Sequence, residues 1–484
     1  MYKHINRIIF RAMSTVQKRP AIGQAKKKHF KRFKPKPIDP TGNEGVLRFE
    51  ISDLLSELEL DPQAAKNDMT AFFNRDRTIP WPEHKEVDLE ISRLSSTGVG
   101  IGMHGGKPVI VPYSLPGDVL RVNIYRTEEY YLEAEIKSVL TASSMRNDEL
   151  VKCRYFGTCS GCQLQMTSYE NQLKFKQDTV INAYKHFAPT LWASGKLPAT
   201  HSTFASPLEY HYRTKLTPHF DVKKPPLTAP PSIGFGIKGR SYVADIEECA
   251  IGVPILNKGL SKERARVHED FARYKRGVTL LLRENGEECV TDPKEIIEED
   301  VAGFKFKYKA GTFFQNNNSI LPIVTEFVRN NIQIRDQPPK YLVDTYCGSG
   351  LFGITCSPAV EQVIGVEISA ESIEFAEQNA KLNNIENAKF VVGEAERIFQ
   401  HVNTAPKDTA VIIDPPRKGC DTKFLDQLVE FLPAKIVYVS CNVHSQARDL
   451  EYLLARTDYK VDSLGGFDFF PQTHHVEGVA VLSR

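Results

Sequence analysis

The pattern of apolar and polar residues changes near residue 315, where apolar runs of strand length begin to alternate with helical segments. The runs predicted as strands are "YLVDTYCGSG", "VIGVEI", "AKFVVGEA", "TAVIIDPP" and "KIVYVSC". The segment "SAESIEFAEQNAKLNN" between them has helical periodicity, and Ser369 is its predicted N-cap. Strand–helix alternation of this kind is typical of a doubly wound α/β sheet, which we therefore expect over residues 311–484.

The preceding part of the chain is predicted to be mostly β. Residues 85–143 alternate apolar and polar positions between Gly-rich turns, which indicates about five short strands and a small OB-like barrel. Such barrels commonly bind single-stranded nucleic acid. Its candidates for stacking or cationic contacts with RNA are Tyr125, Arg126, Tyr130 and Tyr131. Residues 144–310 read as a central, mostly β domain, apart from a helical pattern in "SYENQLKFKQDTVINAYKHF".

The first 84 residues are predicted to be a tail and a linker. Residues 1–38 carry twelve Lys or Arg and no Asp or Glu, so the rest of the chain is net acidic although the whole has a charge of +2. Residues 1–40 are read as a basic disordered tail, an RNA-binding arm, a nuclear-type signal or a mitochondrial presequence. Residues 41–84 are read as a linker with one short helix at Ile51–Leu60.

The composition indicates a protein without membrane spans. No apolar run approaches the ~20 residues that a transmembrane helix needs, and 41% of the residues are apolar and 25% charged. Neither a membrane nor an obligate protein partner is therefore expected.

A glycine-rich turn marks a cofactor site. In "DTYCGSGLFG", Gly348, Gly350 and Gly353 form G-x-G-x-x-G between a strand and a helix, and Glu367 ends the next strand 19 residues after Gly348. An acid at this distance binds a ribose diol, so the pattern fits a dinucleotide or another adenosine cofactor. S-adenosylmethionine is favoured over NAD because "DPPRKG" and a cysteine end the fourth and fifth strands, and nothing is arranged for hydride transfer. Tyr346 could face the donor's sulfonium.

Three further residues near strand ends indicate the chemistry. Asp414 lies in "DPPRKG", Cys441 in "SCN" and Glu477 in "HHVEGVAVL". Carboxyl ends of strands meet at one edge of a parallel sheet, so these side chains could converge. A thiolate that adds to C6 of uracil makes C5 nucleophilic, and a base can then remove the C5 proton after methyl transfer.

These motifs resemble the uridine C5 RNA methyltransferases over roughly residues 85–484. The matching motifs occur in the family's order: "GTFFQNNN", "DTYCGSGLFG", "GVEIS", "DPPRKG", "VYVSCN" and "FDFFPQTHHVE". The resemblance implies a Rossmann-like class I methyltransferase domain and a TRAM domain as the barrel. The long N-terminal extension is similar to that of the fungal branch, which makes 5-methyluridine at position 54 of the tRNA T loop.

The resemblance also assigns site residues. It implies Cys441 as the nucleophile and Glu477 as the proton acceptor. The cofactor contacts that it implies for S-adenosylmethionine are Gln315, Tyr346, Glu367 and Asp414.

Four other cysteines have the spacing of a metal centre. Cys153, Cys159 and Cys162 form C-x5-C-x2-C, and Cys249 follows in "IEECAIG". This spacing can hold a [4Fe–4S] cluster, as in some rRNA-type relatives, or zinc, or it can be left as free thiols. Since methyl transfer has no redox step, the role of a cluster would be structural.

The substrate is expected to be tRNA, from which the uracil must be extruded to reach Cys441. Candidates for RNA contact in the central domain are Tyr212, Arg213 and Lys215. The alternatives are an rRNA uridine methyltransferase and a tRNA-folding chaperone with secondary catalysis. A DNA cytosine methyltransferase is disfavoured, because Ser440 rather than proline precedes Cys441.

Overall fold

The structure is a computed structural model that describes residues 38–60, 85–128, 130–223, 225–394, 398–399 and 402–484. The predictions made for the basic tail, and for the linker beyond residue 60, lie outside these residues. None of the described helices combines the length and the apolar composition that a membrane-spanning helix needs.

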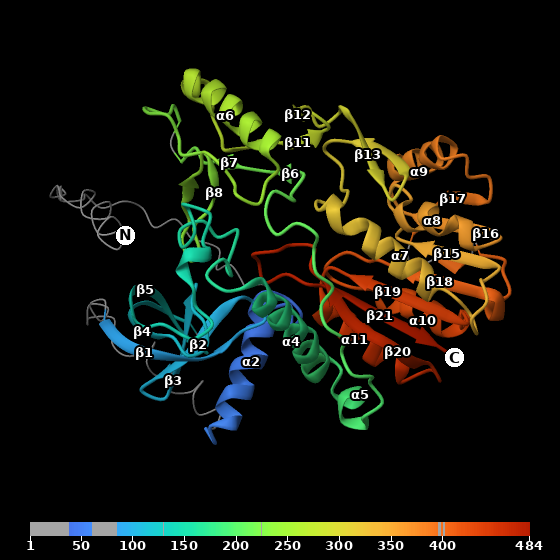
Figure 1. The fold of residues 1–484 in the computed structure, drawn as a ribbon, viewed down its shortest axis with the longest axis horizontal. Coiled ribbons are helices and arrows are strands. Elements are labelled where there is room, and N and C mark those ends of the chain that lie inside the picture. Colours follow the sequence, from blue (N-terminus) through green and yellow to red (C-terminus); the bar gives the residue numbers. More distant parts are fainter. Residues whose placement is uncertain (1–37, 61–84, 129, 224, 395–397, 400–401) are drawn as a thin grey trace, which may run out of the picture. The chain divides into compact units, whose positions relative to one another are not determined.

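The C-terminal part of the chain forms the expected α/β sheet, with seven strands in the order β17-β16-β15-β18-β19-β21-β20 (Figure 1). The first five strands in this order are parallel, and β21 runs antiparallel between β19 and β20. The strands are β15 (Tyr341–Thr345), β16 (Gln362–Glu367), β17 (Ala388–Val392), β18 (Thr409–Ile413), β19 (Lys435–Ser440), β20 (Lys460–Phe467) and β21 (Glu477–Ser483). The helices between or before them are α7 (Leu321–Asn331), α8 (Leu351–Cys356), α9 (Ala370–Leu382), α10 (Thr422–Phe431) and α11 (Val443–Leu454).

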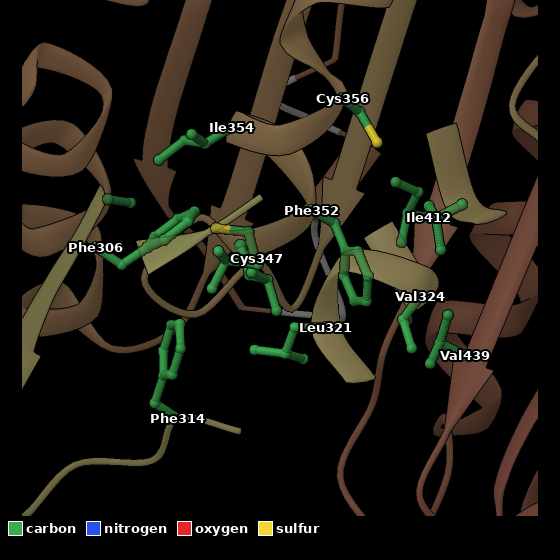
Figure 2. Packing of buried hydrophobic residues seen from close by; sticks show 14 of the residues in the cluster. Phe306, Phe314, Leu321, Val324, Cys347, Phe352, Ile354, Cys356, Ile412 and Val439 are labelled. Atoms are coloured by element: carbon green, nitrogen blue, oxygen red, sulfur yellow. The ribbon is translucent and has the colours of Figure 1, made fainter. Parts of the chain in front are cut away.

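Both faces of this sheet are buried because its strands are apolar throughout. Neighbouring residues of a strand point to opposite faces, so Leu342 joins one apolar core and Val343 the other. Figure 2 shows the first core, in which Phe352 and Val324 pack beside Ile412 and Val439 of the sheet. Near-continuous apolar strands of this kind are what a doubly covered parallel sheet requires.

The predicted N-terminal barrel is confirmed as a closed five-stranded barrel in the order β1-β2-β3-β5-β4. Its strands are β1 (Lys85–Leu94), β2 (Val99–His104), β3 (Lys107–Pro112), β4 (Val119–Thr127) and β5 (Leu132–Thr141). Alternate residues such as Val87, Leu89 and Ile91 point inward and fill it. Closure removes the exposed sheet edges that an open five-stranded sheet would have.

The segment between barrel and sheet combines short strands with three α-helices. The predicted helix is present as α4 (Tyr169–Phe187), which Ser168 caps through the backbone N–H of Asn171. The sequence did not reveal α6 (Pro254–Glu269). The remaining elements are η2 (Asp148–Leu150), α5 (Pro189–Ser194), β6 (Lys215–Leu216), β7 (His219–Phe220), β8 (Gly234–Gly236), β9 (Val243–Asp245), η3 (Phe271–Arg273), β10 (Val278–Thr279), β11 (Leu282–Asn285), β12 (Glu288–Val290), β13 (Ile296–Val301) and β14 (Phe304–Lys309).

A helix near the start of the described chain is longer than expected. The segment predicted as a short helix at Ile51–Leu60 instead forms α2 (Asn43–Glu57). The buried face of α2 packs on the barrel, and Lys185 and His186 of α4 contact Asp53 of α2 (Figure 1). Short helices are stabilised mainly by such packing rather than by their own helix propensity.

Candidate active site

The residues predicted to carry the chemistry share one cavity of about 1540 Å³. Asp414, Cys441 and Glu477 all line it. Pockets for small ligands are usually about 300–1,000 Å³, so this cavity has room for a cofactor and a second group together.

Sheet register places the cysteine and the glutamate opposite each other. Strands β19 and β21 are antiparallel, and their last pair is Ser440 with Gly478. Cys441 follows Ser440, and Glu477 precedes Gly478, so both lie at the same edge of the sheet. The two side chains come together because this pairing is antiparallel, although 36 residues separate them in sequence.

The environment of Cys441 opposes ionisation of its thiol. Burial, reinforced by the carboxyls of Glu477 and Asp414, raises the pKa of Cys441 to about 12. The guanidinium of Arg417 acts in the opposite direction and favours the thiolate. The thiol of the free protein is therefore neutral near pH 7, and it needs a proton acceptor to become a nucleophile.

Two carboxyls beside the thiol share the same low-dielectric site. Burial raises the pKa of Asp414 to about 7, and burial together with the charge of Asp414 raises the pKa of Glu477 well above its usual range. Arg417 again opposes the shift at Glu477. Two close carboxyls cannot both ionise easily, so the pair holds a proton near neutral pH and can exchange it.

The glycine-rich turn is held by two acids. The buried carboxyl group of Asp344, whose pKa is raised to about 8 by burial, accepts a hydrogen bond from the backbone N–H of Gly353 at 2.7 Å. Glu367 accepts one from the N–H of Gly348 at 3.4 Å and one from the N–H of Ser369 at 3.0 Å. These bonds fix the turn between β15 and α8 against the end of β16.

The turn leaves space where a cofactor could lie. Gly348 has a φ of +54°, lines the cavity, and has no atom within 4 Å of the point that a Cβ would occupy. Tyr346 also takes a left-handed φ of 59° and lines the cavity, as do Gln315 and Glu367. The acids and the aromatic ring suit a cationic adenosine cofactor, so the residues present fit S-adenosylmethionine.

The four cysteines of the predicted metal centre also line the cavity. Their charges influence one another: the pKa of Cys162 is raised by burial and by Cys249, Cys159 and Cys153. Burial, opposed by a hydrogen bond from the N–H of Gly161, raises the pKa of Cys159 to about 11. Within the described ranges, however, no group of three or more His, Cys, Asp or Glu is arranged to hold a metal ion. The geometry therefore lends no support to a cluster.

The cysteine loop is attached to the loop that leads into Glu477. The backbone N–H groups of Gln163 and Leu164 both donate to the carbonyl of Gln472, at 2.9 and 3.1 Å. The side-chain oxygen of Gln163 accepts from the N–H of His474 at 3.3 Å. The two loops thus form one wall of the cavity.

A buried ion pair anchors this wall to α4. Lys176 on α4 pairs with Asp468, and both side chains are almost fully buried. The ammonium of Lys176 also donates to the carbonyl of Phe470 at 3.0 Å. A buried charge of this kind requires its partner, so the pair fixes the loop before β21 in a single position.

Two of the residues predicted to touch RNA are engaged inside the protein. Tyr212 is 2% exposed and donates to the carbonyl of Pro471 at 3.0 Å, and Tyr131 is 4% exposed and donates to Glu44 at 2.7 Å. Those two predictions were wrong, because aromatic residues with a satisfied hydroxyl are as typical of a core as of a binding surface. Arg213 does line the cavity.

The remaining candidates keep at least part of their side chains exposed. Arg126 forms ion pairs with Glu128 and Glu133 at the barrel surface. Tyr125 and Lys215 are partly exposed, and Lys215 donates to the carbonyl of Thr312 at 3.3 Å.

Sequence reasoning overlooked Arg417 and Asp344 as contributors to the site. Both stand in quoted motifs, "DPPRKG" and "DTYCGSGLFG". Its position could have identified Arg417, because it follows the strand end that carries Asp414. A cation at that place can balance the negative charge of nearby carboxylates or of a thiolate. Asp344 resembles an ordinary buried strand residue until the bond to Gly353 is seen.

Comparisons with known proteins agree with this architecture. A family model described as tRNA (Uracil-5-)-methyltransferase matches residues 256–484, and a TRAM domain model matches residues 80–137. The tRNA (uracil(54)-C(5))-methyltransferase of Saccharomyces cerevisiae is 42% identical over 537 residues, covering 95% of this chain and 84% of its own. The protein of the same description from Schizosaccharomyces pombe is 43% identical over 493 residues, covering 98% of this chain and 89% of its own.

A solved structure supports the fold. It is described as the Pyrococcus abyssi tRNA (uracil-54, C5)-methyltransferase in complex with S-adenosyl-L-homocysteine. The likeness covers 82% of this chain and all of that one, with a TM-score of 0.60 and 24% identity. At that identity the likeness shows a shared fold.

Proposed function

The chain belongs to the tRNA (uracil-5-)-methyltransferase family, and on this premise we propose which of its residues methylate C5 of uridine 54 in tRNA. One observation carries the assignment: Cys441 and Glu477 occupy opposed positions at the end of β19 and the start of β21 and line a single cavity. A nucleophile and a base are thereby presented to one bound uracil.

Cys441 is the nucleophile. Its proton passes to the carboxyl pair formed by Asp414 and Glu477, whose raised pKa values make the pair an acceptor near neutral pH, and from there to solvent, so that Glu477 is ionised before C5 is deprotonated. The thiolate then forms a bond from its Sγ to C6 of the uracil, and the C5–C6 electron pair becomes an enolate. Arg417 stabilises the negative charge of the thiolate as it develops.

Glu477 is the base of the second half of the reaction. S-adenosyl-L-methionine, when bound, supplies the methyl group to C5. Glu477 then takes the proton that C5 still carries, the C5–C6 double bond re-forms, and the bond from C6 to Sγ breaks to release the thiolate. A carboxylate held at 3% exposure is a stronger base than one in water.

The cofactor is held by residues of the sheet edge. Glu367 is the acceptor for the ribose hydroxyls, since its carboxylate ends β16 beside the Gly348 turn. Tyr346, Gln315 and Asp414 line the rest of this part of the cavity. The acids and the ring favour a positively charged sulfonium over its neutral product.

The target base must leave its stack to reach this site. Cys441 lies at the wall of a cavity, not on a convex surface, so the uracil is extruded at a loss of a few kcal/mol of stacking. Arg213 and Lys238 line the same cavity and place positive charge for the flanking phosphates.

The assignment of the reaction is tested by nucleoside mass spectrometry of tRNA. Cells that lack the protein should lose 5-methyluridine at position 54, and the wild-type gene should restore it. Cys441→Ala, expressed to the same level, should not restore it. Unchanged 5-methyluridine in the deletion strain would overturn the proposal.

The [4Fe–4S] cluster stays a prediction. In its favour, Cys153, Cys159, Cys162 and Cys249 line one cavity and affect one another's pKa. Against it stands the lack, among the described residues, of a group arranged to hold metal. Anaerobic purification followed by iron and sulfide analysis decides the point.

A further inference from the structure

Helix α2 lies between the barrel and the C-terminal sheet. Residues Asp39–Arg484 form one compact unit, so these contacts lie within a single body. Leu47 and Ile51 of α2 belong to the same apolar cluster as Ile101 of the barrel, whereas Val46 belongs to the core cluster that contains Val443 of α11. The segment read as a linker therefore contacts both parts of the protein.

The turn before α2 reaches the residue next to the nucleophile. The side-chain N–H of Asn442 donates to the carbonyl of Thr41 at 3.1 Å and to the carbonyl of Arg417 at 2.9 Å. The side-chain oxygen of Asn442 caps α11 through the N–H of His444. Asn442 thus ties the turn that contains Cys441 to three other segments.

The carbonyl of Thr41 is itself held in place. Asp39 accepts hydrogen bonds from the N–H and the hydroxyl of Thr41, both at 3.0 Å, and Thr41 is 3% exposed. Asn43, two residues further on, lines the cavity. The turn Asp39–Thr41 is therefore an ordered part of the cavity's surroundings.

The middle of α2 contacts a barrel loop that in turn contacts the loop leading into Glu477. The buried carboxylate of Glu50 accepts hydrogen bonds from the hydroxyl of Ser95 and, at 3.0 Å, from the N–H of Ser96 in a barrel loop. Gly98 of that loop touches His474: a Cβ on Gly98 would lie 2.8 Å from the Cβ of His474. His474 belongs to the loop that leads into β21.

We propose that Thr41 and Asn442 are positioning residues for Cys441, held by the Asp39–Thr41 turn in front of α2. The proposal rests on the function proposed above. The hydrogen bond from Asn442 to the Thr41 carbonyl fixes the backbone after β19 and so the direction from which Sγ approaches C6. Reactions of this kind are sensitive to misplacement, and an error of about 1 Å costs on the order of 100-fold in rate.

Gly45→Ala perturbs this contact directly. A Cβ at Gly45 would lie 2.3 Å from the carbonyl oxygen of Pro40 and 2.4 Å from that of Asp39. Both are backbone atoms, so the Asp39–Thr41 turn must shift. Alanine in a helix interior is otherwise favourable compared with glycine, so α2 itself is kept.

Gly42→Ser is the matched control. A Cβ at Gly42 would be 3.4 Å from the carbonyl oxygen of Asp39, an ordinary contact, and serine is a preferred N-cap. A second test variant, Asn442→Ser, keeps an oxygen for capping α11 but removes the donor to the carbonyls of Thr41 and Arg417. It tests the bond even where Gly45→Ala destabilises the fold.

The measurement uses the full chain and tRNA that contains 5-fluorouridine at position 54. Fluorine at C5 cannot leave as a cation, so the covalent adduct accumulates and its rate of formation is read on a denaturing gel. We expect Gly45→Ala and Asn442→Ser to slow the adduct about 10- to 100-fold. Affinity for tRNA and the melting temperature should stay close to wild type, and Gly42→Ser should match wild type throughout.

Three results would overturn the proposal. Adduct formation by both variants at the wild-type rate would show that the bond does not matter. A loss confined to tRNA affinity would make the turn a binding element, and a loss that follows the melting temperature would make it merely structural. If wild-type protein forms no adduct, the proposed function fails instead, which separates the two failures.

Discussion

Two groups of the thiols that line the cavity are built differently. Cys441 follows directly after β19, opposite Glu477 at the start of β21, so hydrogen-bonded register fixes its neighbour. Cys153, Cys159 and Cys162 lie outside helices and strands, and Cys249 follows β9. Strand ends bring a nucleophile and a base together, whereas the loops gather thiols without arranging them for metal.

The ionisable residues that surround the two groups of thiols also differ. Cys441 has Arg417 beside it, which favours the thiolate, and two carboxyls that can accept its proton. Cys162 and Cys249 also have cations near them, Lys176 and Arg213, but the pKa of each thiol is raised by burial and by neighbouring thiols. Proximity of thiols, even beside a cation, is therefore not enough for reactivity, which also requires a proton acceptor.

Removal of the nucleophile should have the largest effect. Cys441→Ala deletes the atom that bonds to C6, and we expect methylation of tRNA to fall on the order of 10⁴-fold or more. The control is Cys289→Ser, at a cysteine that does not line the cavity. Transfer of labelled methyl groups to tRNA measures both, and substantial activity in Cys441→Ala would remove the distinction between the two thiol groups.

Removal of the base should lower activity less than removal of the nucleophile does, and it should leave a covalent intermediate. Glu477→Gln keeps the shape of the side chain but cannot take the C5 proton, so turnover should fall about 10²- to 10⁴-fold. Because the thiol can still add to C6, methylated tRNA should remain covalently attached. A denaturing gel with natural tRNA shows the attached species, and its absence together with a lower rate of addition would give Glu477 a different role.

The ion pair between α4 and the loop before β21 can be broken by substitution of Lys176. Lys176→Met leaves Asp468 buried and unpaired, which should lower the free energy of unfolding by about 3–5 kcal/mol. Urea denaturation measures the change. The control is Lys174→Met, on the exposed side of the same helix, with an expected change within about 0.5 kcal/mol. Equal stability of the two variants would mean that Asp468 is not held by Lys176.

The smallest effect on the reaction is expected at the cysteine loop. Cys159→Ser should leave the turnover number of the folded enzyme within about threefold of wild type, because no step of methyl transfer uses this thiol. Iron and sulfide content, measured on the same anaerobic samples, reports separately on the cluster. A loss of turnover as large as that of Cys441→Ala would refute the division of roles.

Much of the catalytic region could be predicted because its reactive residues directly follow the apolar runs that form the strands. Apolar runs that end in "DPPRKG" or "SCN" predicted both strand ends, and the sheet confirmed where Asp414 and Cys441 lie. The barrel was predictable from alternation and glycine turns for the same reason. In these segments the residues that form the strand are also the ones whose pattern predicts it.

Other features depend on contacts that are distant in sequence. Tyr131 and Tyr212 looked like RNA contacts, but their hydroxyl groups bond to Glu44 and to Pro471 in the folded chain. The bond from Asn442 to Thr41 joins residues about 400 positions apart. No local pattern encodes such partners, so the role of the Asp39–Thr41 turn emerges only from the fold.

The nucleophile is identified most directly by mapping the covalent bond between protein and tRNA. Wild-type protein is incubated with tRNA that carries 5-fluorouridine at position 54 and with S-adenosyl-L-methionine, digested, and sequenced by tandem mass spectrometry. We expect a single nucleotide-bearing peptide with the modification on Cys441. A nucleotide attached to Cys159, Cys162 or any other residue, or no attached nucleotide at all, would contradict it.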